Sequence, residues 1–470
     1  MSVHILGNSS SVKNYIYNTV NSIGSTVSVS AFNLFDYLLP TYIENVERDH
    51  INPTSSTHWL ITELNEGLKT ITVDNPLPVE LADSGTTYDT RWFAYCGPGS
   101  WVDVANVDFD TNTITYTELR NGDDPWVQHG SNVHFLCPFR SAKPNPLNVI
   151  VDADNLWADL WVLPGPSWQC EDLTYRLVVN GYNSSAPRYN TTTLYSSNDL
   201  ETWSLVGSSY KYKAGVAPFD ESWCVGTVNH NTHGTPIKIR DGVYEGYYMN
   251  LFQGLNVSGE MHCAAVIFDE NYDIIYMPTN PLVITGYVPD ATDKYNIGEG
   301  VFYRGDKLYA VVSYRDLLPD NQYKILLCEL SGPVDPTVIS VVEVLPDTIP
   351  NCWMSLSAPG GPALEYKGKL YFFIVGENST GYTENTPLKN NFECGVIYEN
   401  GSDYVVHKQN PFIFNAVNMT EFYNWSSPML DSLGTFSSWL RVDDDIHMFI
   451  AAKDGTDGYR VWKYVLHLPE

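Results

Sequence analysis

The sequence contains few groups of residues that could bind a metal ion. His230 and His233 are three residues apart in the segment Val-Asn-His-Asn-Thr-His-Gly. In a loop this spacing says little, and structural histidines held by hydrogen bonds are the favoured interpretation. Asp152 with Asp154, and the run Asp443–Asp445, could supply carboxylate oxygens to calcium. Aspartate is also expected at turns for backbone reasons. We therefore predict no metal and no cofactor, with calcium as the weaker alternative.

Tryptophan side chains provide a second kind of candidate site. They occur in the expected loops before the inner strands, at Trp168, Trp223, Trp353 and Trp425. Aromatic rings at the mouth of a ring-shaped fold can stack on sugar rings. Packing between neighbouring sheets is the alternative, and it accounts for most tryptophans in such folds. The sequence leaves both interpretations open.

A recurring unit indicates the fold that must position these residues. A polar turn followed by a short aromatic-rich strand begins at Asp154, Asp241, Gly305, Gly368 and Asp444. A short strand precedes the turn and a hairpin follows it, which together make one four-stranded antiparallel blade. We therefore predict an all-β fold, a β-propeller with five or possibly six four-stranded blades. A β-sandwich also has short strands, but it does not repeat this unit five times.

The propeller is expected to occupy residues 57–470. Two further hairpins are predicted at 58–73 and 101–117, and 88–119 could form a degenerate extra blade, which leaves the blade count open. The last copy of the unit ends at Glu470 without an outer strand of its own. An N-terminal strand could complete this blade and close the ring.

Residues 1–56 differ from the rest of the chain. Apolar residues occur at mixed spacing in 11–20 and 31–46, so one or two short helices are plausible. We predict a short, partly helical N-terminal extension that attaches the propeller to something else or packs under the ring.

The charge balance excludes several classes of partner. The chain has 470 residues, with 26 Lys and Arg against 55 Asp and Glu, and a formal net charge of −29. So few cations make binding to nucleic acid or to an anionic membrane surface improbable. No apolar run approaches the roughly 18 residues of a membrane span, so no membrane insertion is expected. Glycine-rich phosphate loops and a Gly-x-Ser-x-Gly nucleophile motif are also absent from the sequence.

The composition also bears on where the protein acts. No basic segment followed by an apolar segment opens the sequence, so we expect no conventional signal peptide. Eight Asn-x-Ser/Thr sequons occur in the sequence. The eight cysteines include no Cys-x-x-Cys pair, so we expect the cysteines to be buried core residues. The composition is typical of an extracellular protein, although no secretion signal is visible. A protein that leaves the cell as part of a virus particle would combine these two features. We therefore predict that the protein is made in the host cytoplasm and is located in the virion.

One segment carries a family resemblance. Residues 195–207, Tyr-Ser-Ser-Asn-Asp-Leu-Glu-Thr-Trp-Ser-Leu-Val-Gly, resemble a blade motif of the five-bladed propellers of glycoside hydrolase family 43 and its relatives. The segments 298–309 and 361–372 are similar to other blades of that family, and the resemblance covers about residues 144–468. It implies that Glu299 corresponds to the family's general acid.

The rest of the family's carboxylate set is not matched. The resemblance aligns the family's catalytic base with Asn145, which cannot accept a proton, and its third carboxylate with Thr235. A lone carboxylate can bind a sugar hydroxyl, but it cannot carry out a mechanism that needs two such groups. The alignment could be displaced by one blade, because Asp152, Asp154 and Asp159 lie near Asn145.

These observations predict a non-catalytic component of a bacteriophage tail or fibre. It would bind a host surface glycan or a neighbouring virion protein through a face of the propeller. The alternative is an active glycoside hydrolase that uses Glu299 as its acid and acts on a plant-type or bacterial polysaccharide, and a third possibility is a scaffold without a ligand. The predicted ligand-binding residues are Glu299, Asn145, Thr235, His233, Trp168, Trp223 and Trp353.

Overall fold

The fold was analysed in a computed structural model. The structure describes residues 51–54, 56–86, 91–97, 100–120, 127–136, 145–150, 162–183, 189–206, 217–225, 231–232, 234–290, 294–316, 322–344, 356–377, 393–407, 432–453 and 459–467. Within these ranges the protein is all-β, as predicted, and its one helical segment is the short 3-10 helix η1 (Val79–Asp83). A membrane-spanning helix is not found in the described part of the chain. The helices predicted before residue 51 lie outside it.

Residues 51–136 form two four-stranded antiparallel sheets. One sheet has the order β1-β2-β6-β5, with β1 (Ile61–Asn65), β2 (Thr70–Val73), β6 (Thr113–Thr115) and β5 (Asn106–Asp108). The other has the order β7-β4-β3-β8, with β7 (Leu119–Arg120), β4 (Ser100–Asp103), β3 (Phe93–Gly97) and β8 (His134–Leu136). The hairpin predicted at 58–73 is present as β1-β2. The hairpin predicted at 101–117 is present only as β5-β6, because the first residues of its expected strand belong to β4 in the other sheet.

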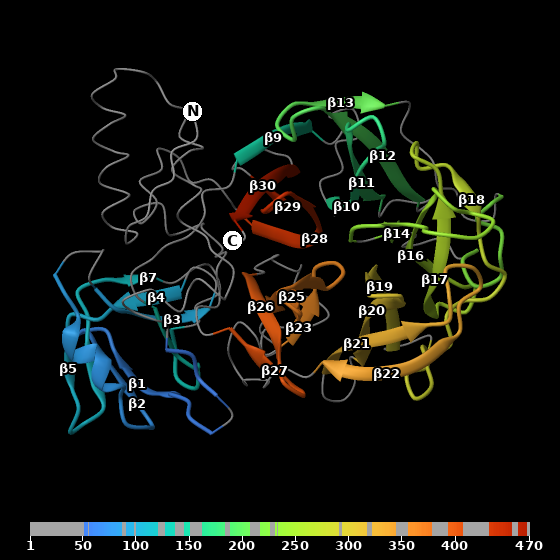
Figure 1. Cartoon of the computed structure of the whole chain (residues 1–470). Coiled ribbons are helices and arrows are strands. Elements are labelled where there is room, and N and C mark those ends of the chain that lie inside the picture. Colours follow the sequence, from blue (N-terminus) through green and yellow to red (C-terminus); the bar gives the residue numbers. More distant parts are fainter. Residues whose placement is uncertain are drawn as a thin grey trace, which may run out of the picture.

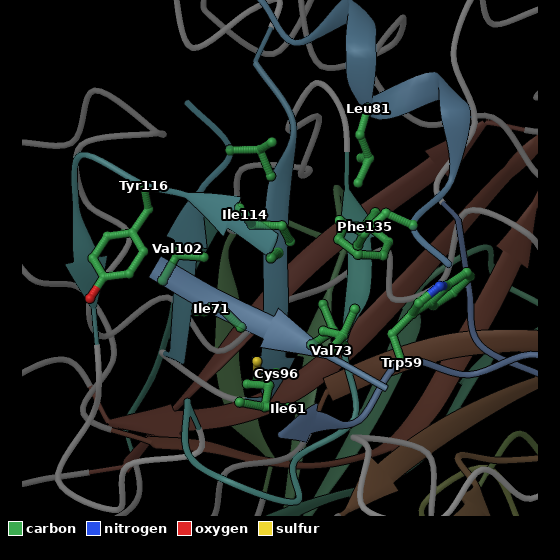
Figure 2. Close-up of a cluster of buried hydrophobic side chains, with 14 of the residues drawn as sticks. Trp59, Ile61, Ile71, Val73, Leu81, Cys96, Val102, Ile114, Tyr116 and Phe135 are labelled. Carbon is green, nitrogen blue, oxygen red and sulfur yellow. The ribbon is translucent and has the colours of Figure 1, made fainter. Parts of the chain in front are cut away.

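A common core joins these two N-terminal sheets. Trp59, Ile71, Val102, Ile114 and Phe135 belong to one buried cluster that both sheets line (Figure 2). The opposite side of the second sheet packs elsewhere, because its Phe93, Tyr95 and Trp101 belong to a cluster with residues after 300. The N-terminal sheets are therefore fixed to the rest of the protein by apolar contacts.

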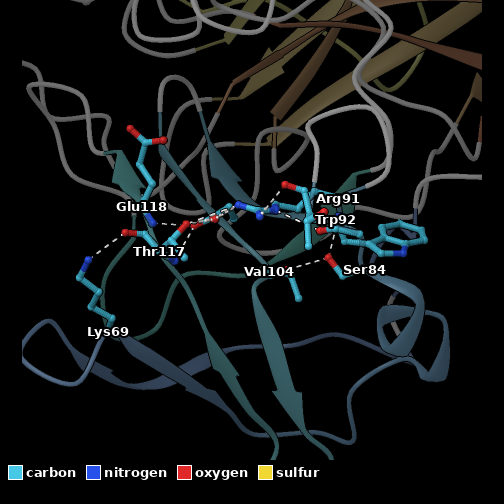
Figure 3. Close-up of polar contacts among 10 residues, drawn as sticks. Lys69, Ser84, Arg91, Trp92, Val104, Thr117 and Glu118 are labelled. Carbon is cyan, nitrogen blue, oxygen red and sulfur yellow. Dashed lines mark hydrogen bonds and ion pairs between the residues drawn. The ribbon is translucent and has the colours of Figure 1, made fainter.

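A buried carboxylate ties the loops of the N-terminal sheets together. Asp103 is 1% exposed. It accepts hydrogen bonds from Arg91 Nη1 at 2.5 Å, from the backbone N–H of Thr117 at 2.8 Å and from that of Glu118 at 2.6 Å. Figure 3 shows these contacts beside the hydrogen bond from Lys69 Nζ to the Thr117 carbonyl. The charge of Asp103 is thus matched by a guanidinium and by backbone donors, which is what a buried carboxylate requires.

The remaining strands form antiparallel sheets that follow one another around a ring (Figure 1). Ring sheet 1 contains β10 (Val162–Gln169), β11 (Tyr175–Asn183), β12 (Tyr189–Ser197) and β13 (Trp203–Val206). Ring sheet 2 contains β14 (Asn231–Thr232), β15 (Ile237–Lys238), β16 (Tyr248–Leu255), β17 (Met261–Phe268) and β18 (Ile274–Tyr276). Ring sheet 3 contains β19 (Lys294–Arg304), β20 (Lys307–Asp316), β21 (Gln322–Leu330) and β22 (Val338–Val344). Ring sheets 2 and 3 are linked by one parallel pairing, Met261 with Tyr295.

The last two ring sheets complete the circle. Ring sheet 4 contains β23 (Leu356–Pro359), β24 (Leu364–Tyr366), β25 (Lys369–Glu377), β26 (Glu393–Asn400) and β27 (Asp403–Val406). Ring sheet 5 has the order β28-β29-β30-β9, with β28 (Ser432–Val442), β29 (Asp445–Lys453), β30 (Tyr459–His467) and β9 (Asn145–Ile150). Its outer strand β9 therefore comes from a point in the chain before ring sheet 1.

Apolar packing holds each ring sheet against the next. A separate buried cluster fills each of the seams 1–2, 2–3, 3–4, 4–5 and 5–1. Members of these clusters from the two facing sheets are Trp168 and Phe268, Leu251 and Val301, Val311 and Phe372, Phe373 and Trp439, and Trp203 and Phe449. Because the fifth seam joins sheet 5 back to sheet 1, the ring is closed by hydrophobic burial as well as by β9.

The recurring turn of the sequence marks the same structural position in most sheets. The turns at Gly305, Gly368 and Asp444 precede β20, β25 and β29, and the turn at Asp241 precedes β16. Apart from Val162, the copy that begins at Asp154 lies outside the described residues. In ring sheet 1 the equivalent turn is instead 171–174, before β11. Its sequence is Glu-Asp-Leu-Thr, and it lacks the glycine that marks the turns at Asp241, Gly305 and Gly368.

Candidate functional site

Glu299 lies on β19 at an irregularity of the strand. Its neighbours Gly298 and Gly300 are opposite Val312 and Val311 on β20, so Glu299 is the extra residue of a register shift in the strand. Such a β-bulge re-aims a side chain and is common beside functional sites. Gly300 has φ 148°, a conformation that favours glycine. The sequence Gly-Glu-Gly therefore permits the bulge that positions Glu299.

The two flanking glycines also allow neighbouring sheets to approach. A Cβ at Gly300 would lie 2.7 Å from Pro362 Cδ and 2.9 Å from Pro362 N. A Cβ at Gly298 would lie 3.1 Å from Leu251 Cδ1 and would contact Leu251 Cβ even more closely. Ring sheets 2 and 4 thus both pack onto the backbone around Glu299, and a larger residue at either position would separate them.

The carboxyl group of Glu299 is almost completely shielded from solvent. The residue is 3% exposed, and burial raises its pKa to about 7. The Arg315 guanidinium and the Ser313 hydroxyl, both on β20, oppose this shift. Among the described residues, the groups that act on the pKa of Glu299 are thus a cation and a hydroxyl.

Residues of four ring sheets meet around Glu299, and we call this group the axial cluster: Gly234, Thr235, Glu299, Gly361, Pro362 and Trp439. Gly234, with φ 71°, contacts the Glu299 carbonyl oxygen so closely that no Cβ fits between them. Thr235 Oγ1 donates a hydrogen bond to the Trp439 carbonyl, and Trp439 Nε1 donates one to the Pro362 carbonyl at 3.2 Å. These contacts join ring sheets 2, 3, 4 and 5 through backbone groups and an indole ring.

A buried hydroxyl pair joins the first and last ring sheets beside the axial cluster. Ser167 Oγ on β10 and Ser438 Oγ on β28 are 2.7 Å apart, and both residues are fully buried. One hydroxyl donates to the other, so each buried oxygen has a hydrogen-bond partner within the protein. The inner strands β10 and β28 are therefore held together directly.

Two of the predicted aromatic site residues lie inside the protein. Trp168 is 2% exposed and packs 5.5 Å from Phe268 and 5.7 Å from Tyr248, measured between ring centroids. Trp223 is 3% exposed, and its Nε1 donates a hydrogen bond to the Pro278 carbonyl at 2.9 Å. Both rings contact protein groups in the seam between ring sheets 1 and 2. For these two residues the structure shows packing between sheets.

The other predicted site residues are not gathered at one place. Asn145 lies on the outer strand β9, opposite Lys463, whereas Thr235 and Glu299 belong to the axial cluster. His233 and Trp353 lie outside the described residues, as do His230, Trp425, Asp152, Asp154 and Asp159. The run Asp443–Asp445 forms the turn between β28 and β29, with Asp443 at φ 53°. Within the described ranges no three His, Cys, Asp or Glu side chains are grouped as metal ligands.

Sequence reasoning missed most of the axial cluster. Gly361 and Pro362 were visible only as part of a blade motif, and nothing in the sequence placed Trp439 beside them. Arg315 and Ser313 carried no motif of their own. Alternation along the strand before Asp316 would have placed them on one face, since they are two residues apart. Their proximity to Glu299 follows from the pairing of β19 with β20.

Comparisons with known proteins found similarity only at the level of structure. No family model matches the sequence. A search of curated proteins also found no match. A solved structure of β-1,2-mannobiose phosphorylase from Listeria innocua aligns with a TM-score of 0.45 and 11% identity, covering 68% of this chain and 97% of that chain. An endo-arabinase from Bacteroides thetaiotaomicron aligns with a TM-score of 0.43 and 12% identity, covering 69% and 99%. A β-xylosidase structure aligns with a TM-score of 0.42 and 10% identity, covering 69% and 94%.

Proposed function

We propose that this protein is a five-bladed β-propeller that binds a host surface glycan, or a neighbouring virion protein, without cleaving it. In this proposal it is a component of a bacteriophage tail or fibre, and residues 1–56 attach it to the particle. In this proposal binding takes place on a face of the ring, because the axial cluster packs ring sheets 2, 3, 4 and 5 closely together around Glu299. The acidic, cation-poor composition of the chain suits sugar hydroxyls or a protein neighbour better than a polyanion.

The observation that carries the proposal is the burial of Glu299 behind the axial cluster. A glycosidic acid must come within hydrogen-bond reach of the leaving oxygen, and a second carboxylate must stand roughly 5–10 Å away across the bond. Glu299 is 3% exposed, and its pKa responds to Arg315 and Ser313. Gly234 and Pro362 pack closely against the backbone of Glu299 and Gly300, so the described surroundings of this residue are tightly filled.

A hydrolysis screen separates the proposal from the alternative of an active enzyme. The full chain would be incubated with arabinan, xylan, fructan and bacterial surface polysaccharides, and reducing ends would be measured. We expect no release above background. Release that disappears in Glu299→Gln and persists in Glu365→Gln, a control on the half-exposed strand β24, would show a glycosidase and overturn the proposal.

Binding and location need two separate measurements. A glycan array probed with the labelled full chain is expected to give a signal on at least one surface polysaccharide, and this signal should survive in Glu299→Gln. Mass spectrometry of purified particles is expected to find the chain in stoichiometric copies. Absence from the particle would contradict the virion role, whereas a silent array would leave the neighbouring virion protein as the partner.

A further inference from the structure

The outer strand of ring sheet 3 has an exposed, apolar edge. β22 (Val338–Val344) reads Val-Ile-Ser-Val-Val-Glu-Val and pairs with β21 on one side. Among the described residues no strand pairs with its other side, where it forms the lower rim of the ring in Figure 1. Ile339 is 61% exposed and Val342 is 47% exposed. β-branched side chains therefore flank a free row of backbone donors and acceptors.

This edge has one irregularity, a register shift with β21 at Ile339, but few of the other features that normally keep such strands apart. Proteins protect exposed edges with lysine, proline, inward-pointing charges or very short strands. β22 has seven residues and contains neither lysine nor proline. Its single charged side chain, Glu343, is occupied within the molecule, since it accepts hydrogen bonds from Lys324 Nζ at 3.0 Å and from the Tyr287 hydroxyl. The strand is thus suited to accept another strand.

The apolar surface continues from β22 onto ring sheet 2. Val334, in the turn before β22, is 37% exposed, and Ile275 on β18 is 43% exposed. The two places adjoin, because Tyr276, the neighbour of Ile275, is hydrogen-bonded to Asp335. The exposed edge of β22 therefore belongs to a wider apolar rim, a type of surface that marks protein–protein contacts.

The charges around β22 favour a second copy of this chain as its occupant. Each copy carries a net charge of −29, so two copies repel one another over most of their surfaces. Beside β22, however, the carboxylates are neutralised: Glu329 pairs with Lys307 at 2.9 Å and Glu343 pairs with Lys324 at 3.0 Å. Lys307 on β20 and Lys324 on β21 are two of the 26 cations of the chain, and both lie in the sheet that ends at this edge. Copies of the protein can approach here with Glu329 and Glu343 already neutralised.

We propose that β22 pairs antiparallel with β22 of a second copy, which extends ring sheet 3 across a two-fold axis. The same surface is used by both copies, so the contact closes as a dimer and leaves no further free edge there. The backbone groups of both edges become hydrogen-bonded, and Ile339 and Val342 of each copy are removed from water.

The oligomeric state of the full chain tests this proposal. We expect sedimentation velocity to show a concentration-dependent monomer–dimer equilibrium that shifts toward dimer as salt is added, because salt screens the repulsion between the two acidic copies. Ile339→Lys and Val342→Lys place a charge on the edge and are expected to weaken the dimer about tenfold or more. Leu205→Lys, on the outer strand β13 and 59% exposed in the parent chain, is the matched control and should leave the dimer intact.

A crosslinking experiment locates the contact. The described cysteines are buried, so a new thiol on the edge provides the reactive site. Ser340→Cys should give a crosslinked dimer with a short bismaleimide, and Ser204→Cys on β13 should not. A chain that remains monomeric at all concentrations would overturn the proposal, and so would a dimer that survives both lysine variants. Unchanged thermal melting of the variants would show that any loss of dimer is not a loss of folding.

Discussion

Lys463 on β30 forms an ion pair with Glu201, which lies in the turn between β12 and β13. The lysine side chain is 2% exposed, whereas that of the glutamate is 54% exposed. The pair crosses the seam between ring sheets 5 and 1. Lys463 is also the residue opposite Asn145 on β9. The buried Lys463 therefore lies where β30 meets two other parts of the ring. These are ring sheet 1 and the strand β9, which completes ring sheet 5.

The unequal burial of this pair predicts unequal effects of mutation. Glu201→Ala leaves the Lys463 ammonium buried without a counter-charge, and we expect it to lower the free energy of unfolding by about 1–3 kcal/mol. Lys463→Met keeps the apolar stem and leaves Glu201 in water, so its effect is expected to be smaller or even stabilising. Urea denaturation measures both. Glu63→Ala, at an exposed position on β1, is the control, and an equal loss in both test variants would contradict the argument.

His447 predicts a loss of stability in mild acid. Burial and the neighbouring Lys463 charge lower its pKa from 6.5 to about 4. As the pH falls below 6.5, His447 becomes protonated in the unfolded chain but stays neutral in the folded chain. The free energy of unfolding therefore decreases until about pH 4. The slope from this one group is at most about 1.4 kcal/mol per pH unit. His447→Gln should remove this component from stability curves measured between pH 4 and 7, and curves parallel to the parent would refute it.

Glu299 predicts a pH dependence of the opposite sign. Its pKa is raised from 4.5 to about 7, so the protonated carboxyl stabilises the fold at low pH. The contribution is complete below about pH 4.5 and is lost as the pH rises to about 7, where the buried group ionises. Compared with the parent, Glu299→Gln should therefore become relatively more stable between pH 4.5 and 7, and the difference should level off above that. A difference independent of pH would show that the carboxyl is hydrated.

The axial cluster predicts a severe effect at Gly234. Alanine there would be strained by the positive φ and would collide with the Glu299 carbonyl, which is backbone and cannot rotate away. We expect Gly234→Ala to cost about 3 kcal/mol or more. Gly242→Ala is the matched control, because Gly242 also has a positive φ of 90° but nothing within 4 Å of its added Cβ. It should cost about 1–2 kcal/mol, and equal thermal shifts in the two variants would argue against this close packing.

Local signals in the sequence were sufficient for the strands and their turns. The turns at Gly305, Gly368 and Asp444 were predicted because polar, flexible residues and the alternating strands beside them are encoded within a few residues. The all-β fold and the two N-terminal hairpins follow from the same kind of short-range pattern. Glu299 was singled out because residues 298–309 resemble a short family segment, which is also a local pattern, and the structure shows a bulge at this glutamate between its two glycines.

The environment of Glu299 could be decided only by the tertiary structure. Gly234, Pro362 and Trp439 come from ring sheets 2, 4 and 5, and they meet only because the ring closes. Closure in turn depends on the pairing of Asn145 with Lys463, two residues from distant parts of the chain. Such contacts decide whether a carboxyl group is exposed and reactive or buried and structural. Desolvation depends on the groups that surround the carboxyl in the folded protein, and these are not its neighbours in sequence.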